Sequence, residues 1–299
     1  MDDKSEPGSS TSTRAPLAYE NTAFLNSRDA RSLRILSEYL EPLARFRRQQ
    51  VQDTVVFFGS ARFHSRSAAQ SALEFLEKPG SRQPASPEWQ AQIRRANADL
   101  QMARYFEDAR RLAFLLTQWS LAIPSRRRFV VTTGGGPGIM EAANLGASEA
   151  GGKTIGLNIR LPYEQMPNRY ITPELNFEFH YFFMRKLWFA YLAKALVVFP
   201  GGFGTLDEMF EILTLVQTEK LSKPIGVAVY GREFWTKVVN FEALAEMGAI
   251  SPQDLDLFTF VDSPEEAFEF LKGHLTRHYL VPGPAGRPGR VPELAKTRP

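Results

Sequence analysis

Short runs of apolar residues alternate along this chain with longer amphipathic stretches. The runs are rich in β-branched and aromatic residues, which is typical of buried strands. We expect strands near residues 54–58, 129–133, 154–158, 176–180, 195–199, 225–229 and 258–261. Apolar residues at helical spacing predict helices near residues 30–48, 138–150, 183–194, 206–219, 232–247 and 264–277.

The order of these elements indicates the fold class. Strands and helices alternate, and the strands are apolar throughout, so both faces of the sheet must be covered. We therefore predict an α/β fold, a doubly wound parallel sheet of the Rossmann-like type with helices on both faces. Residues 17–280 are assigned to one domain with a helical insert at about 63–128. Within the insert, residues 88–119 predict one long helix and residues 79–84 a loop.

Composition excludes several classes of protein. The 299-residue chain has no cysteine, so it forms no disulfide, and its net charge of +3 does not point to nucleic acid. Residues 1–16 and 281–299 carry few groups that could pack, and we expect both to be disordered tails. The longest apolar region, Leu187–Phe199, is broken by Lys194 and is too short to span a bilayer. With no secretory signal in 1–16, we expect a cytoplasmic protein.

Candidate chemistry lies in a glycine loop. The apolar run at 195–199 leads into Pro200-Gly201-Gly202-Phe203-Gly204-Thr205-Leu206-Asp207-Glu208, and an amphipathic run follows. A strand, glycine loop and helix in this order place free backbone N–H groups and a positive helix end around one small volume, which suits a phosphate. Glu208 falls in the first helical turn. A carboxylate beside a phosphate site suggests chemistry, although it could also complement the helix dipole.

Two further loops follow the same order. Gly134-Gly135-Gly136-Pro137-Gly138-Ile139-Met140 comes after the run at 129–133, and Gly59-Ser60 comes after the run at 54–58. Such loops meet at the carboxyl edge of a parallel sheet, where open α/β sheets bind ligands. The dinucleotide fingerprint is not met, because Ile139 stands at its third glycine position. Without a triphosphate loop either, the pattern suggests a monophosphate ligand.

The two longer glycine motifs resemble the paired signatures of the Lonely Guy family. Arg185-Lys186 also matches that family, since Arg185 precedes Glu208 by 23 residues. The resemblance covers roughly residues 53–278, and the insert is similar to the long-chain branch. It implies phosphoribohydrolase activity on cytokinin riboside 5′-monophosphates, with relatives that act on AMP and an older label of lysine decarboxylase. Phe182-Phe183-Met184 departs from the Met-His that commonly precedes the Arg-Lys pair in the family.

The resemblance and the loops together give a candidate site. Glu208 is the expected catalytic carboxylate, because a ribosyl transition state is oxocarbenium-like. Arg185 is expected to orient Glu208, contact phosphate or stabilise the departing base. Thr205 is expected to cap its helix. The expected substrate-binding residues are Ser60, Gly135, Gly136, Gly138, Met140, Lys186, Gly201, Gly202, Gly204, Thr205 and Glu211.

The functional hypothesis is hydrolysis of purine nucleoside 5′-monophosphates to free base and ribose 5-phosphate, without metal or organic cofactor. His274 and His278 are four residues apart but lack a third ligand, which favours a surface helix over a zinc site. The alternatives are a non-catalytic nucleotide carrier and a decarboxylase that uses pyridoxal phosphate. Apart from the small-molecule substrate, we expect no nucleic-acid or membrane partner. The aromatic run at 177–189 predicts at least a homodimer, unless it packs inside the monomer.

Overall fold

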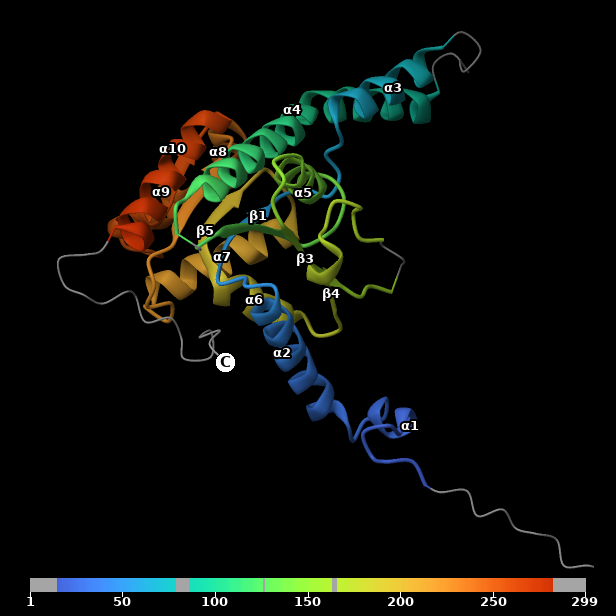
Figure 1. The fold of residues 1–299 in the computed structure, drawn as a ribbon. Helices are drawn as coiled ribbons and strands as arrows, with labels where there is room; N and C mark the ends of the chain where they lie inside the picture. The colour runs from blue at the N-terminus through green and yellow to red at the C-terminus, as the bar shows by residue number, and fades with distance from the viewer. Residues whose placement is uncertain (1–14, 79–85, 126, 163–165, 282–299) are drawn as a thin grey trace, which may run out of the picture.

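The computed structural model describes residues 15–78, 86–125, 127–162 and 166–281. Seven parallel strands form one sheet in the order β4-β3-β2-β1-β5-β6-β7 (Figure 1). The strands are β1 Asp53–Phe58, β2 Phe129–Thr133, β3 Thr154–Ile159, β4 Asn176–Phe179, β5 Ala193–Val198, β6 Gly226–Tyr230 and β7 Thr259–Val261. The chain winds outward from β1 in one direction to β4, then in the other direction from β5 to β7. The doubly wound α/β fold is therefore confirmed.

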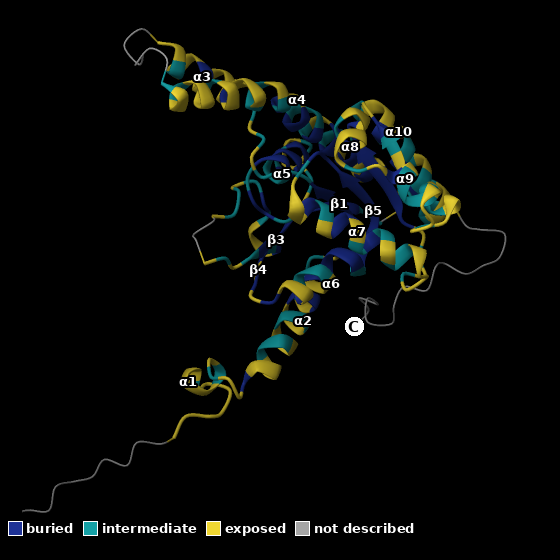
Figure 2. Ribbon diagram, turned by 180° about the vertical axis from the view of Figure 1, so that it is seen from behind, coloured by how far each residue is buried: buried dark blue, intermediate teal, exposed yellow. Residues whose placement is uncertain are grey.

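Helices cover both faces of the sheet, and each face has its own apolar core. Side chains of α2, α6, α7, α8 and α9 pack on one face, and those of α4, α5 and α10 pack on the other. The central strands β1, β2 and β5 between them are buried along their whole length, whereas the edge strands β4 and β7 are partly exposed (Figure 2). The α-helices are α1 Thr22–Leu25, α2 Arg31–Arg48, α3 Arg66–Glu77, α4 Pro87–Ala122, α5 Ile139–Glu149, α6 Phe182–Leu192, α7 Phe203–Gln217, α8 Arg232–Val238, α9 Phe241–Glu246 and α10 Pro264–Leu275. Shorter helical turns are η1 Pro173–Leu175, η2 Pro252–Leu257 and η3 Thr276–Leu280.

One expected helix differs from the structure. The pattern at 232–247 predicts a single helix, whereas the chain forms α8 and α9. Val239 between them is extended, with φ −134° and ψ 123°. The Asn240 side chain then accepts a hydrogen bond of 2.9 Å from the Ala243 N–H and so caps α9. Because asparagine competes well for such amides, it begins a new helix there instead of continuing the old one.

The insert between β1 and β2 contains the expected long helix, α4, and a shorter helix, α3, that the sequence pattern did not predict. Ser86 caps α4, since its hydroxyl accepts from the Trp89 N–H at 3.1 Å, and Pro87 occupies the first turn. Together, α3 and the first half of α4 extend beyond the sheet as an arm (Figure 1). The expected loop at 79–84 and nearly all of the two expected tails lie outside the described residues.

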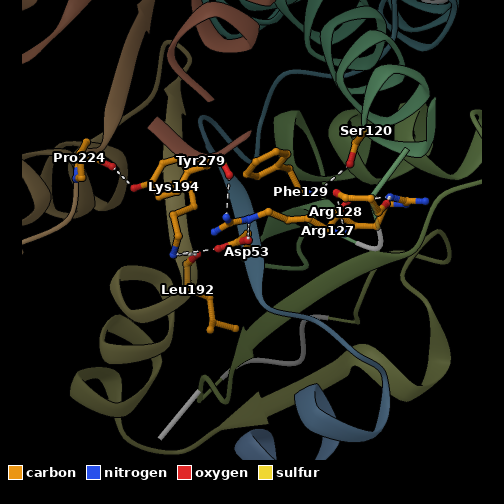
Figure 3. Close-up of polar contacts among 10 residues, drawn as sticks. Asp53, Ser120, Arg127, Arg128, Phe129, Leu192, Lys194, Pro224 and Tyr279 are labelled. Atoms are coloured by element: carbon orange, nitrogen blue, oxygen red, sulfur yellow. Dashed lines mark hydrogen bonds and ion pairs between the residues drawn. The ribbon is translucent and has the colours of Figure 1, made fainter. Parts of the chain in front are cut away.

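A buried ionic cluster joins the amino ends of the central strands to the end of the described chain (Figure 3). Asp53 at the start of β1 pairs with Arg127, and it also pairs with Lys194 of β5 at 3.0 Å. Arg127 donates a hydrogen bond of 2.8 Å to the carbonyl oxygen of Tyr279. The Tyr279 ring lies 5.5 Å from the Lys194 ammonium, and its hydroxyl donates to the Pro224 carbonyl. The cluster thus fixes the edge of the sheet opposite the glycine loops.

Candidate functional site

The candidate site is a cavity of about 770 Å³ at the carboxyl ends of the central strands. This size suits a small organic ligand. The strand order reverses between β1 and β5, which is where open α/β sheets form a crevice. The cavity wall consists of Phe58, Gly59, Ser60, Ala61, Arg62, Phe63, Gly134, Met140, Arg185, Phe189, Gly201, Gly202, Phe203, Gly204, Thr205, Leu206, Glu208, Phe234 and Val238.

Backbone hydrogen bonds join the three loops that follow β1, β2 and β5. The Ser60 N–H donates to the carbonyl oxygen of Pro200 at 3.0 Å, which connects the first strand's loop to the loop after β5. The Ser60 carbonyl in turn accepts from the Ile139 N–H at 3.0 Å, where α5 begins. The two glycine loops, which lie far apart in the sequence, therefore meet around Ser60, as their common position at the carboxyl edge predicts.

The loop after β5 and the first turn of α7 line the cavity with residues 201–206. Gly202 is the N-cap of α7 and has no side chain to satisfy the first amides. The Leu206 N–H donates to the Gly202 carbonyl at 3.0 Å, so the three preceding amides have no partner within the helix. Thr205 was expected to cap this helix, and that expectation is wrong, because it lies in the first turn. Its side chain is buried against Gly201, where a Cβ would collide with it.

Glu208 and Arg185 form a partly buried ion pair in the cavity wall. One Oε of Glu208 lies 3.3 Å from an Nη of Arg185, and the two side chains are 6% and 14% exposed. Burial raises the pKa of Glu208 to about 7, although the charges of Arg185 and Lys186 act in the opposite direction. Burial also lowers the pKa of Arg185. Glu208 can therefore exchange a proton near neutral pH, while the cation beside it favours its charged form.

A second ionic group supports α6 and α7 behind this pair. The Lys186 ammonium lies 2.9 Å from Asp207 and 2.9 Å from Glu211, both on α7. Lys186 and Glu211 do not line the cavity. Both were expected to bind substrate, but in the structure they pair with each other and connect the helices that carry Arg185 and Glu208.

The glycines of the loop after β2 have different positions. Gly134 lines the cavity, whereas Gly135, Gly136 and Gly138 do not. Gly138 has a φ of +71°, and a Cβ there would collide with the Ser60 carbonyl and the Ala61 backbone. Gly135 has a φ of +77° and packs against the Asn158 side chain. Gly138 therefore allows the loops after β1 and β2 to pack closely, and Gly135 allows its own loop to pack against β3.

Polar side chains that the sequence analysis did not single out hold this loop. Asn168 donates to the carbonyl oxygens of Gly135 and Gly136, each at 3.1 Å, and to the Asn144 side chain at 2.9 Å. Thr133 donates to Asn144 at 2.7 Å and accepts from the Gly135 N–H at 2.9 Å. No spacing in the sequence marks Asn168, because it comes from the connection after β3.

Several wall residues were also not foreseen. Eight of the predicted residues line the cavity, namely Ser60, Met140, Arg185, Gly201, Gly202, Gly204, Thr205 and Glu208. Arg62 and Phe63 come from the loop after β1, where only Ser60 was singled out. Phe234 and Val238 come from α8, which follows the last motif by some distance. Within the described residues there is no cluster of three or more histidine or carboxylate side chains suited to a metal, and no helix suited to crossing a membrane.

Known proteins with a similar sequence identify the family of this chain. The model of the family described as possible lysine decarboxylase matches residues 140–271. The cytokinin riboside 5′-monophosphate phosphoribohydrolase LOG1 of Arabidopsis thaliana is 30% identical over 162 residues, covering 52% of this chain and 73% of that protein. The probable enzyme LOGL6 of rice, Oryza sativa subsp. japonica, is 28% identical over 155 residues, covering 51% and 60%. The chain belongs to the Lonely Guy family.

Two solved structures also match this chain over almost all of their own length. The molybdenum cofactor binding protein of the phototrophic bacterium Rippkaea orientalis is 18% identical, with a TM-score of 0.44 over 75% of this chain and 98% of that chain. The Moco carrier protein of Chlamydomonas reinhardtii is also 18% identical, with a TM-score of 0.42 over 75% and 99%.

Proposed function

We propose that this protein hydrolyses the N-glycosidic bond of purine nucleoside 5′-monophosphates. Water adds to the anomeric carbon, the bond to the base nitrogen breaks, and the base leaves with a proton, giving free base and ribose 5-phosphate. The observation that carries this proposal is the Glu208–Arg185 pair, which lies in the same cavity wall as the free amides at the start of α7. The phosphoribohydrolase relatives support it.

Phosphate binding is the first role of the site. The amides of Phe203, Gly204 and Thr205 lie at the positive end of the α7 dipole and lack partners within the helix. A phosphate placed there would put the attached ribose within the cavity that Glu208 lines. Loop glycines at 201, 202 and 204 leave room for this approach.

Glu208 would act on the ribose. A carboxylate near the anomeric carbon stabilises the positive charge that develops as the glycosidic bond breaks, and it can accept a proton from the attacking water. Its pKa of about 7 keeps a large carboxylate fraction at neutral pH while leaving it basic enough for that transfer. Arg185 would orient the carboxylate and stabilise negative charge on the departing base.

The base would contact the apolar part of the wall. Met140, Phe189, Phe234 and Val238 line the cavity together with the charged pair. Aromatic and aliphatic side chains suit the faces of a purine, and an exocyclic hydrocarbon substituent would also find apolar surface there. We therefore include both AMP and N6-prenylated AMP in the substrate class.

Two alternative functions make different use of the cavity. A carrier would bind the nucleotide without cleaving it, but a buried carboxylate beside a phosphate site weakens anion binding and has no role in carriage. A decarboxylase using pyridoxal phosphate requires a lysine for the Schiff base. None of the cavity-lining residues found in the described part of the chain is a lysine.

The test is incubation of the purified protein with AMP and with isopentenyladenosine 5′-monophosphate, followed by chromatography for free base and ribose 5-phosphate. Release of base from either nucleotide supports the hydrolase. Binding of a nucleotide without release supports the carrier and contradicts our proposal. Release of carbon dioxide from lysine, with no base release, would instead support the decarboxylase.

Two substitutions connect the activity to the site. We expect Glu208→Gln to lower kcat by about 100- to 1,000-fold while substrate binding is retained, because the shape is kept and the charge is lost. Arg185→Ala should lower the rate as well and leave Glu208 without its cation. Glu269→Gln removes an exposed carboxylate from α10, on the opposite face of the sheet, and serves as the control. A near-normal rate in Glu208→Gln would show that this residue only complements the helix dipole.

A further inference from the structure

Arg62 lines the cavity, and its guanidinium has no partner among the described residues. Among the described residues that line it, the charged side chains are Arg62, Arg185 and Glu208. Arg185 is paired with Glu208 at 3.3 Å. The Arg62 side chain is exposed, and no ion pair or hydrogen bond of its guanidinium is found within the described part of the chain. The cavity therefore contains one positive group that no protein group neutralises.

The backbone that carries Arg62 is held at a fixed place. The Arg62 N–H donates to the Ser60 hydroxyl at 3.1 Å. Ser60 itself is bonded through its N–H to Pro200 and through its carbonyl to Ile139, each at 3.0 Å. The backbone of Arg62 is thus fixed between the two glycine loops, while its unpaired side chain is available to bind a ligand.

The helical insert supports the far end of the same loop. The ring of Phe63 stacks on Tyr105 of α4, with centroids 6.2 Å apart. The Arg66 N–H donates to the Glu107 carboxylate of α4 at 3.1 Å. The loop after β1 is therefore anchored on both sides of Arg62, by the sheet edge before it and by the insert after it.

Charge balance indicates what Arg62 could bind. A phosphate monoester carries nearly two negative charges at pH 7. The amides at the start of α7 supply a positive potential equivalent to roughly half a charge, and Glu208 lies in the same wall. A guanidinium pairs with two phosphate oxygens at once and stays charged at any working pH.

We propose that Arg62 is a ligand of the substrate's 5′-phosphate, closing the phosphate site opposite the α7 amides. The proposal rests on the proposed function for the identity of the anion. It assigns Arg62 a binding role, with no part in the cleavage of the glycosidic bond. It predicts that Arg62 separates phosphorylated from unphosphorylated ligands.

The test is calorimetric titration of the full-length protein with ribose 5-phosphate, AMP and adenosine. We expect Arg62→Ala to weaken binding of ribose 5-phosphate and AMP by about 10- to 100-fold, the usual effect of losing a charged hydrogen-bond partner. Binding of adenosine should not change. Arg62→Lys should restore part of the loss, because it keeps the charge but not the two-pronged geometry. Added salt should weaken wild-type binding more than that of Arg62→Ala.

Arg66→Ala is the matched control, since it removes an exposed arginine side chain from the same segment that does not line the cavity. Thermal unfolding checks that all variants are folded. Wild-type affinity of Arg62→Ala for ribose 5-phosphate would overturn the proposal, as would an equal loss for AMP and adenosine. If Arg62 proves essential for ribose 5-phosphate binding but no nucleotide is cleaved, the phosphate-binding role of Arg62 is supported and the hydrolase proposal fails. If AMP is cleaved and Arg62→Ala binds it normally, the reverse holds.

Discussion

Glu208 is subject to two opposing influences. Its side chain is 6% exposed, so desolvation favours the neutral acid, while Arg185 at 3.3 Å favours the carboxylate. Desolvation is the larger effect, and the resulting pKa is about 7. The same carboxylate in water would be ionised throughout the neutral range. The site therefore contains an acid whose charge changes near neutral pH.

This titration predicts a pH dependence of the reaction. Below pH 7 Glu208 is increasingly protonated, and a neutral acid neither stabilises an oxocarbenium ion nor accepts a proton from water. We expect kcat/KM for AMP to rise with pH, with a midpoint near 7, because kcat/KM reports groups of the free enzyme.

The substrate phosphate also titrates, with a pKa near 6. Measuring ribose 5-phosphate affinity over the same pH range separates that effect from Glu208. The residual activity of Glu208→Gln should lack the rise near pH 7. A wild-type rate that is flat, or that falls as pH increases from 6 to 8, would contradict the role of Glu208 as a carboxylate.

For single residues, the sequence predicted which residues form the site better than it predicted what surrounds each of them. The motif spacing brought out Glu208 and Arg185, and the structure places them in one wall. Their 3.3 Å separation depends on how α6 and α7 pack, which no local pattern contains. Arg62 carried no signal, because an arginine after a strand is most often a solvated surface residue.

At the scale of elements, the glycines of the two loops differ in whether they would tolerate substitution by alanine. Gly138 combines a positive φ of +71° with a backbone collision for any Cβ. We expect Gly138→Ala to lower the free energy of unfolding by roughly 1–3 kcal/mol or more and to lower activity with it, because the loops after β1 and β2 would be forced apart. Thermal or urea unfolding, alongside the nucleotide assay, measures both effects.

Gly204→Ala is the matched comparison. Gly204 lies in the first turn of α7, and a Cβ there meets nothing within 4 Å. Stability should be unchanged or slightly higher, since alanine is the better helix former by about 1 kcal/mol. Affinity for ribose 5-phosphate should fall, because the added methyl group narrows the cavity where the amides are exposed. Equal destabilisation by both substitutions would contradict the assigned difference.

The elements themselves were predictable where their pattern was long. The helix at 88–119 was expected, and α4 spans Pro87–Ala122. The break between α8 and α9 was missed because the apolar spacing continues through it, while Asn240 makes a local cap that spacing does not reveal. The helix α3 was not predicted, although the sequence does contain its signals: Ser65 caps it, and its buried residues Ala69 and Leu73 lie four positions apart.

At the scale of the whole molecule, the aromatic run at 177–189 divides between core and surface. Phe177, Phe179 and Trp188 are buried in the core of the monomer. For these three residues the alternative of packing inside the monomer therefore holds, and not the subunit interface. Phe182 and Phe183 at the start of α6 are each 50% exposed, and Leu187 is 38% exposed. Within this run, the smaller patch formed by Phe182, Phe183 and Leu187 is the candidate for subunit contact.

We predict that the protein forms at least a homodimer through this patch. Light scattering at micromolar concentration should give a mass of at least twice the 33.7 kDa of one chain. Phe183→Glu should lower that mass and also the activity, since α6 carries Arg185. Met247→Glu, at an 84% exposed position on the end of α9, is the control. A mass of one chain with full activity would refute both the assembly and its coupling to catalysis.

The parallel direction of the strands followed from the alternation of apolar runs and helices, because parallel strands need crossover connections. The sequence did not predict the part of the cavity wall that comes from elements far from the glycine motifs. Phe234 and Val238 reach the site only because β6 lies beside β5 and α8 follows it. Such contacts depend on strand order, which the pattern of single elements leaves open.

The ionic cluster around Asp53 also affects when the fold can be completed during synthesis. Asp53, which pairs with Arg127, begins the central strand and is translated early. Tyr279 accepts a hydrogen bond from Arg127 through its carbonyl oxygen and lies near the end of the described chain. The contacts of this cluster can therefore be completed only after Tyr279, whose ring covers Lys194, has been translated. A chain whose synthesis stops before Tyr279 lacks both the carbonyl that accepts from Arg127 and the ring beside Lys194, so this edge of the sheet is completed last.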